Sequence, residues 1–372
     1  MWLFLLLGLL TIGYAGLINR FKRGWDRLPY FSPSPSTAPL PYVTVLIPAR
    51  NEAATIGKLL QALQQQTYPS EHCEVIVIND HSTDETVAVV EQFPFVKLIH
   101  LTNEEHQAHK KRALEMGVAQ AKGSFILCTD ADCLPTPRWV ATMVACHLEQ
   151  KAVFVAAPVF LENEQTLLGR FQTLDFLVLQ GITAAGIQQG FIYMANGANM
   201  GYAKTAFEAV EGYKGVRKLA SGDDFFLLHK IKDHYPHQIG FVQSADAIMR
   251  TAAMPTWSAF LHQRIRWASK STHYQNKTIQ FVLLLVWLYN LSFLLGLLMA
   301  IKKIEWLLII LIALLVKTQL EWPFVQAVSK FYQFPLRKKT FFAFQPLHIL
   351  YITFTGLLGL RGTYTWKGRQ VR

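Results

Sequence analysis

Four long apolar segments, one at the start of the chain and three near its end, restrict the folds open to this sequence more than any other feature. Residues 2–18 form an apolar run without a charge, and further runs cover residues 278–301, 304–325 and 341–360. A helix needs about 20 mostly apolar residues to cross a bilayer. Because 51% of the residues are hydrophobic and 16% are charged, a disordered chain is excluded and an ordinary soluble enzyme is disfavoured.

The flanks of these segments suggest how they lie in a membrane. The first run has no basic residue before it and no A-x-A cleavage site after it, and four Lys or Arg residues follow within residues 20–27. A membrane anchor with a cytoplasmic C-terminal flank is therefore favoured over a cleaved signal peptide. The last run contains Gln345, Pro346 and His348 and precedes a basic tail, so we expect that it does not cross the bilayer fully.

The net charge of +11 favours anionic partners, either phosphates or an anionic membrane face. The block-wise apolar content favours the membrane, and nucleic acid is not expected as a partner. The four cysteines, Cys73, Cys128, Cys133 and Cys146, form no C-x-x-C pair. They are expected to be packed free thiols in a reducing compartment, and metal binding by Cys128 and Cys133 is the less favoured alternative.

Between residues 42 and 274 short β-branched runs alternate with helical patterns. Strands rich in Val and Ile that alternate with amphipathic helices predict an α/β fold with a doubly wound, mostly parallel sheet. Ligands bind to such sheets at the carboxyl ends of the strands. The expected strands are 43–47, 74–78, 96–101, 125–129 and 153–156, and the expected helices are 53–66, 84–92, 106–121 and 138–150.

The chain is expected to divide into five segments. They are a transmembrane anchor (1–19), a basic flank with a Pro/Ser linker (20–41), a cytoplasmic catalytic domain (42–253), an interfacial helix (254–276) and a C-terminal membrane region with two or three apolar segments (277–372).

Polar residues gather where three of the expected strands end. The first strand is followed by Arg50 and Glu52, the second by Asp80, and the fourth by Asp130-Ala131-Asp132. Each could be a loop or a helix cap, since Asp is a natural N-cap. Two carboxylates one residue apart repel each other, however, and Mg²⁺ or Mn²⁺ relieves that repulsion when it binds carboxylates and phosphate oxygens together.

Two further motifs lie outside the strand ends. Lys110 begins an amphipathic helix, where it either belongs to a solvated face or reaches a diphosphate. Ser221-Gly222-Asp223-Asp224 enters an apolar helical stretch, so Asp223 can be a cap, while Asp224 beside two Phe residues suits a general base.

Residues 257–270 mix aromatic and basic residues just before a membrane segment, which is typical of an interfacial amphipathic helix. That interpretation explains Arg264 and Lys270 fully. It explains the grouping of Gln263, Arg266 and Trp267 less well, because an Arg and a Trp so placed can bind a phosphate and a sugar or lipid headgroup.

In this order and at intervals of tens of residues, these motifs resemble those of the membrane-bound family 2 glycosyltransferases, which are inverting enzymes with a GT-A fold. The resemblance covers about residues 42–274. It rests on Asp80, Asp130/Asp132, Asp223/Asp224 and Gln263/Arg266/Trp267, together with the stretches VTVLIPARNEAATI and NGANMGYAKTAFEAVEGY.

The resemblance implies a role for each matching residue. Ala49, Arg50, Glu52 and Asp80 would hold the nucleotide, Lys110 would occupy the position of a diphosphate-binding lysine, and Asp130 and Asp132 would bind sugar and metal. Asp224 would be the general base beside Asp223, which stands where many members have Glu. Gln263, Arg266 and Trp267 would line the acceptor and diphosphate site.

The expected function is therefore inverting transfer of a sugar from a UDP- or GDP-sugar to a lipid-linked or membrane-surface acceptor, with Mg²⁺ or Mn²⁺. The protein would be integral to the inner or plasma membrane, with its catalytic domain in the cytoplasm. A processive polysaccharide synthase remains the alternative, and an inactive membrane scaffold of the same fold is an alternative of another class. A transporter is disfavoured because the polar motifs lie outside the apolar segments.

Overall fold

The computed structural model describes residues 2–34, 39–101, 109–162, 165–217, 219, 221–274, 276–360, 364–366 and 369–371. The chain forms two compact units. The sheet unit comprises Leu28–Asn163 and Gly186–Ala253, and the membrane-helix unit comprises Met1–Arg27, Glu164–Ala185 and Met254–Arg372.

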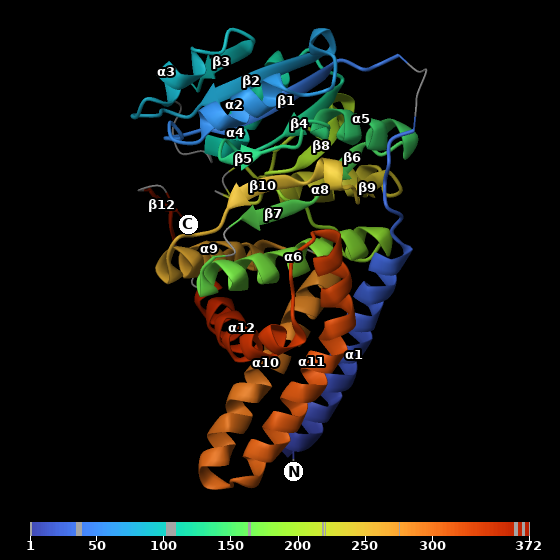
Figure 1. Ribbon diagram of the computed structural model, residues 1–372, viewed down its shortest axis with the longest axis vertical. Coiled ribbons are helices and arrows are strands. Elements are labelled where there is room, and N and C mark those ends of the chain that lie inside the picture. The colour runs from blue at the N-terminus through green and yellow to red at the C-terminus, as the bar shows by residue number, and fades with distance from the viewer. Residues whose placement is uncertain are drawn as a thin grey trace. The chain divides into compact units, whose positions relative to one another are not determined.

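The sheet unit is built on a seven-stranded sheet with the order β3-β2-β1-β4-β8-β6-β9 (Figure 1). Strands β1 to β4 run parallel, whereas β8 is antiparallel to both of its neighbours. The strands are β1 Val43–Ala49, β2 Cys73–Asn79, β3 Val96–His100, β4 Phe125–Cys128, β6 Phe154–Ala156, β8 Met200–Ala203 and β9 Ile239–Phe241. A smaller sheet has the order β5-β10-β7, with β5 Cys133–Leu134, β7 Val159–Glu162 and β10 Met249–Ala252.

Burial on both faces explains why the parallel strands read as continuous apolar runs. Val45, Leu46 and Ile47 in β1 have no exposed surface, as expected for a central parallel strand covered by helices. The helix α2 (Ile56–Gln64) buries Ile56, Leu59, Leu60 and Leu63 at helical spacing. The other helices are α3 Thr86–Val90, α4 His109–Gln120, α5 Trp139–Glu149, α7 Lys204–Ala209 and α8 Asp223–His234.

The prediction of a doubly wound, mostly parallel sheet is confirmed, because each of the five expected strands is present within two residues of its expected bounds. The antiparallel strand β8, inserted between β4 and β6, was not predicted. Of the expected helix 106–121, residues 106–108 lie outside the described residues.

The membrane-helix unit contains four helices that are long and apolar enough to cross a membrane. They are α1 Trp2–Arg27, α10 Lys277–Lys302, α11 Glu305–Phe331 and α12 Lys338–Gly359, and they pack as one bundle (Figure 1). Helix α1 continues through its basic flank to Arg27, since Arg and Lys are good helix formers. The unit also holds most of α6 Leu167–Gln188, α9 Trp257–Ser269, and a hairpin of β11 Tyr364–Trp366 and β12 Arg369–Val371.

Candidate active site

The carboxyl ends of β1 and β2 bring the first predicted site residues together. Ala49 lies opposite Asn79 in the parallel register, and the Asp80 amide donates to the Ala49 carbonyl at 2.8 Å. Nη1 of Arg50 donates to the Asp80 carbonyl at 2.8 Å and lies 3.7 Å from Oδ1 of Asp80. The side chain of Asp80 is only 6% exposed, so this cation holds a nearly buried carboxylate at the strand ends.

The two loops that follow β1 and β2 are joined by hydrogen bonds. The Glu52 amide donates to Oγ1 of Thr86 at 2.8 Å, and the Ala53 amide donates to Oδ2 of Asp84 at 3.1 Å. Burial acts to raise the pKa of Asp84, but hydrogen bonds from Thr86 and Ala53 outweigh it and leave that pKa lowered. Asp84 is therefore a structural residue that fixes the loop carrying Glu52.

Lys110 joins the D-x-D motif to the acidic pair. Its Nζ donates to Oδ1 of Asp130 at 2.8 Å and lies 3.2 Å from Oδ2 of Asp223. Burial lowers the pKa of Lys110, but the carboxylates of Asp130 and Asp223 outweigh this effect and raise it well above its usual value. Gly197 permits this approach, because a Cβ there would lie 3.0 Å from both Nζ of Lys110 and Oδ2 of Asp223.

Asp224 is the second residue of α8 and follows Asp223 directly. Its Oδ2 accepts from the Gly197 amide at 3.2 Å, and its Oδ1 accepts from the Phe225 amide at 2.7 Å. Gly222 precedes the pair with a φ of 81°, a left-handed conformation that glycine adopts without strain. The half-buried Asp224 carboxylate is thus oriented by backbone amides beside Asp223.

Asp132 is solvent-accessible and concentrates negative charge at the site. Neighbouring residues partly desolvate the Asp132 carboxyl group, which raises its pKa, and the negative charges of Asp130 and Glu52 raise that pKa further. The described residues contain no cluster of three or more His, Cys, Asp or Glu that could enclose a metal. The carboxylates nevertheless suit Mg²⁺ or Mn²⁺, which bind through one or two carboxylates and take their other oxygens from phosphates and water.

Lys111, which follows Lys110 in the same basic run, was expected on a solvated face or at a diphosphate, but it is buried and supports the site. Its side chain is 1% exposed, and its Nζ donates to the carbonyls of Val216, Leu219 and Ser221 at 2.9, 2.6 and 3.0 Å. It therefore holds the loop that leads into Gly222 and the acidic pair. The sequence did contain a sign that Lys111 is buried. It lies three and seven residues before Leu114 and Val118, on the helix face that both of these buried residues occupy.

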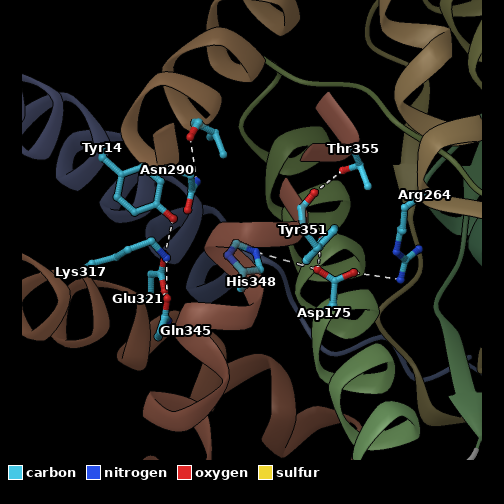
Figure 2. Close-up of polar contacts among 11 residues, drawn as sticks. Tyr14, Asp175, Arg264, Asn290, Lys317, Glu321, Gln345, His348, Tyr351 and Thr355 are labelled. Carbon is cyan, nitrogen blue, oxygen red and sulfur yellow. Dashed lines mark hydrogen bonds and ion pairs between the residues drawn. The ribbon is translucent and has the colours of Figure 1, made fainter. Parts of the chain in front are cut away.

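The Q-x-x-R-W residues lie on α9 in the membrane-helix unit. Gln263, Arg266 and Trp267 are half-buried, and Gln263 and Arg266 share one face at a spacing of three residues. The residue between them, Arg264, is buried and pairs with Asp175 on α6 (Figure 2). Its Nη2 lies 2.9 Å from Oδ2 of Asp175. Its guanidinium also lies 4.2 Å from the centre of the Trp267 ring.

The predicted residues thus form two groups. Within the sheet unit, the first comprises Ala49, Arg50, Glu52, Asp80, Lys110, Asp130, Asp132, Asp223 and Asp224. Within the membrane-helix unit, the second comprises Gln263, Arg266 and Trp267, and Arg264 supports it from the buried side of α9.

Residues 44–210 match the sequence profile of glycosyl transferase family 2. These residues form a glycosyl transferase family 2 domain. The chain is 28% identical over 239 residues to the probable glycosyltransferase YdaM of Bacillus subtilis, across 62% of this chain and 55% of the relative. The chain is also 28% identical over 253 residues to the beta-monoglucosyldiacylglycerol synthase of a Synechocystis species, across 64% of this chain and 50% of the relative.

A third relative, the poly-beta-1,6-N-acetyl-D-glucosamine synthase of Staphylococcus epidermidis, is 25% identical over 228 residues, across 61% of this chain and 53% of the relative. The chain spans about half the length of these curated relatives. Among solved structures, a mannosyltransferase from Pyrobaculum calidifontis in complex with GDP-Man and Mn²⁺ matches with a TM-score of 0.55 at 18% identity, over 95% of this chain and 98% of that one. The predicted GT-A-type fold is thereby confirmed.

Proposed function

We propose that this glycosyltransferase moves a sugar, with inversion, from a UDP- or GDP-sugar to a lipid-linked acceptor at the membrane surface. The observation that carries the proposal is the convergence on Lys110, which contacts Asp130 of D-x-D and Asp223 of the acidic pair. In this proposal, one ammonium thus holds a donor-binding carboxylate and the neighbour of the general base. The mannosyltransferase of similar fold is named with GDP-Man and Mn²⁺, which supports this donor class and metal.

In this proposal each residue acts through its own chemistry. Ala49, Arg50, Glu52 and Asp80 bind the nucleotide. Asp132 and Asp130 would hold Mg²⁺ or Mn²⁺, which when bound supplies positive charge for the leaving diphosphate. Asp224 accepts the proton of the acceptor hydroxyl, on the face of the sugar opposite the leaving group, so the anomeric configuration inverts.

The remaining residues stabilise the leaving diphosphate or contact the acceptor. Lys110 and Arg266 stabilise the leaving diphosphate by charge-assisted hydrogen bonds. Asp223 orients Lys110, from which it lies 3.2 Å away. Gln263 and Trp267 contact the acceptor.

The acceptor and location follow from the apolar helices. Four helices could cross a membrane, and a relative is named as a beta-monoglucosyldiacylglycerol synthase. The helices support an enzyme of the inner or plasma membrane, and the relative's name supports a lipid acceptor. The basic residues that follow the first apolar run support a cytoplasmic catalytic domain.

Processive polysaccharide synthesis is the second candidate, favoured by the relative named as a poly-beta-1,6-N-acetyl-D-glucosamine synthase. Gel separation of the labelled product distinguishes the two functions, since single transfer gives one discrete lipid product and processive synthesis gives a ladder or a high-mass polymer.

The test is turnover by purified protein offered a panel of UDP- and GDP-sugars, Mg²⁺ or Mn²⁺, and total membrane lipid. We expect Asp224→Asn to lower kcat by about 10²–10⁴-fold with donor binding retained, the usual contribution of a general base. Asp233→Asn, the same change at an exposed position of α8, is the control. An active Asp224→Asn variant refutes the assigned base, and a wild type that never releases nucleoside diphosphate supports the inactive scaffold instead.

A further inference from the structure

The membrane-helix unit encloses a cavity of about 140 Å³ next to buried ionisable side chains. Aliphatic and aromatic residues of α1, α6, α10, α11 and α12 form most of its wall. Cavities of about 150 Å³ with apolar walls accept benzene-sized molecules. A mostly apolar cavity with a few polar groups on its wall is typical of a small-molecule site.

The polar wall carries two carboxylates, and each is paired with a cation. Glu321 accepts from Nζ of Lys317 at 2.6 Å and also from the hydroxyl of Tyr14. Asp175 accepts from the hydroxyl of Tyr351 and pairs with Arg264. Both carboxylates nevertheless remain on the cavity wall.

The cations of both pairs are already engaged by these carboxylates. Asp175 and Glu321 are among the lining residues, but Lys317 and Arg264 are not, and no described lining residue is Lys or Arg. An anionic headgroup placed here would meet two carboxylates with no cation to bind it, and desolvating that charge would be costly. The wall therefore selects an uncharged ligand.

His348 offers a hydrogen-bonding atom to such a ligand. Figure 2 shows its ring between the Glu321 and Asp175 clusters. Its Nε2 lies 4.0 Å from Oδ1 of Asp175. Its Nδ1 is buried and has no hydrogen-bond partner among the described residues. An unpaired polar atom in such a place is costly unless a ligand or water satisfies it.

Part of the cavity wall is apolar and only half-buried. Val178 and Ile182 of α6, Val286 of α10 and Ile352 of α12 line the cavity and keep part of their surface exposed. Four of the five helices that line the cavity are long and apolar enough to cross a membrane, so a molecule dissolved in the bilayer is the ligand best able to enter.

We propose that this cavity binds the acceptor as an uncharged lipid, with its first chain carbons against the apolar wall and an ester or hydroxyl oxygen at Nδ1 of His348. The inference rests on the proposed function and narrows its acceptor to neutral lipids, excluding lipid phosphates. The hydroxyl that receives the sugar is a different group of the same molecule, which stays outside the cavity.

The test uses the full chain in nanodiscs and two photoactivatable probes. One is a diacylglycerol with a diazirine near the ester of one chain, and the other is the phosphatidic acid with identical chains. We expect the diacylglycerol to label peptides of α6, α11 or α12 at least fivefold more than the phosphatidic acid. Unlabelled diacylglycerol should compete.

Variants locate the label. Val178→Trp and Ile182→Trp fill the cavity and should each reduce labelling about tenfold, and His348→Phe should weaken it severalfold. Leu308→Trp, a side chain 64% exposed on α11 and outside the lining, should label like the wild type. Equal labelling by phosphatidic acid, or full labelling of both filling variants, overturns the inference.

The inference and the proposed function fail separately. If nucleoside diphosphate is released with a lipid-phosphate acceptor while diacylglycerol does not label the cavity, the function stands and the cavity assignment falls. If diacylglycerol labels the cavity but no donor is turned over, the lipid site stands and the proposed function falls.

Discussion

Replacing Lys111 by Met tests whether a single buried ammonium holds the loop in front of the acidic pair. Met has a similar length and shape but no donor, so the carbonyls of Val216, Leu219 and Ser221 lose their hydrogen bonds. Each buried carbonyl without a partner costs about 1–3 kcal/mol. Removing the ammonium also removes its desolvation cost, so we expect a local loss of about 3–5 kcal/mol, the usual range when one partner of a buried charged contact is removed.

Hydrogen exchange measures this loss where it occurs. A change of about 3–5 kcal/mol raises the opening equilibrium by at least about 10²-fold, so peptides covering residues 216–226 should exchange at least that much faster. Peptides of β1 and β2 should keep their protection. Sugar transfer should fall because Asp223 and Asp224 follow this loop directly.

Lys122→Met is the matched control, since it removes the same charge from an exposed position of the same unit. It should leave exchange and transfer unchanged. Wild-type protection of residues 216–226 in Lys111→Met, together with normal transfer, would refute the positioning argument. Global unfolding would appear instead as faster exchange in β1 and β2.

Three further predictions address the metal, the α9 helix and pH. Asp132→Asn, or excess EDTA on the wild type, should abolish transfer, and Mn²⁺ should raise the unfolding temperature of the wild type but not of the variant; full activity in EDTA would contradict the metal assignment. Arg264→Met leaves Asp175 buried without its cation and should reduce transfer at least tenfold while donor affinity, measured by calorimetry, stays the same; a change in donor affinity alone would show that Arg264 does not act through α9. Burial lowers the pKa of His147 from 6.5, although its hydrogen bond with the Ala152 carbonyl opposes this shift. The unfolded chain therefore binds more protons than the folded one, and the sheet unit should lose stability as pH falls below about 6.5. His147→Phe should flatten that dependence in denaturant titrations at pH 7.5 and 5.5, and an unchanged slope would exclude His147 as its source.

The parallel half of the sheet was predictable because its strands are buried on both faces. Such strands appear in the sequence as short apolar runs between amphipathic helices, as β1 and β2 do. Strand β8 was not predictable in this way. Its four residues, Met200–Ala203, include Gly201, whose missing side chain leaves room for Phe125 and weakens the strand signal. Pairing between residues so distant in sequence depends on packing.

The same distinction applies to the site. The positions of Asp80 and Asp130 followed from the rule that parallel strands end at one edge of the sheet. Lys110 was expected to face a diphosphate, and only the structure shows its contacts with Asp130 and Asp223. Arg264 was explained as an interfacial cation, whereas it is buried against Asp175. Ion pairs between helices distant in sequence leave no periodic signal.

The buried polar cluster of the membrane-helix unit explains why α1 belongs to the same bundle as the last helices of the chain. Tyr14 of α1, Lys317 and Glu321 of α11 and Gln345 of α12 form one hydrogen-bonded network. Burying an ammonium and a carboxylate costs several kcal/mol per ion, so apolar residues would hold the helices together equally well.

An apolar interface, however, would permit α1 to shift by one turn, about 5.4 Å, with similar packing. The network opposes such a shift, because it would take the Tyr14 hydroxyl away from Glu321, whereas Glu321 would keep its contacts with Lys317 and Gln345 on α11 and α12. Since Glu321 and Gln345 also line the cavity, the contacts that fix the register of α1 fix the polar wall against which an uncharged lipid would bind.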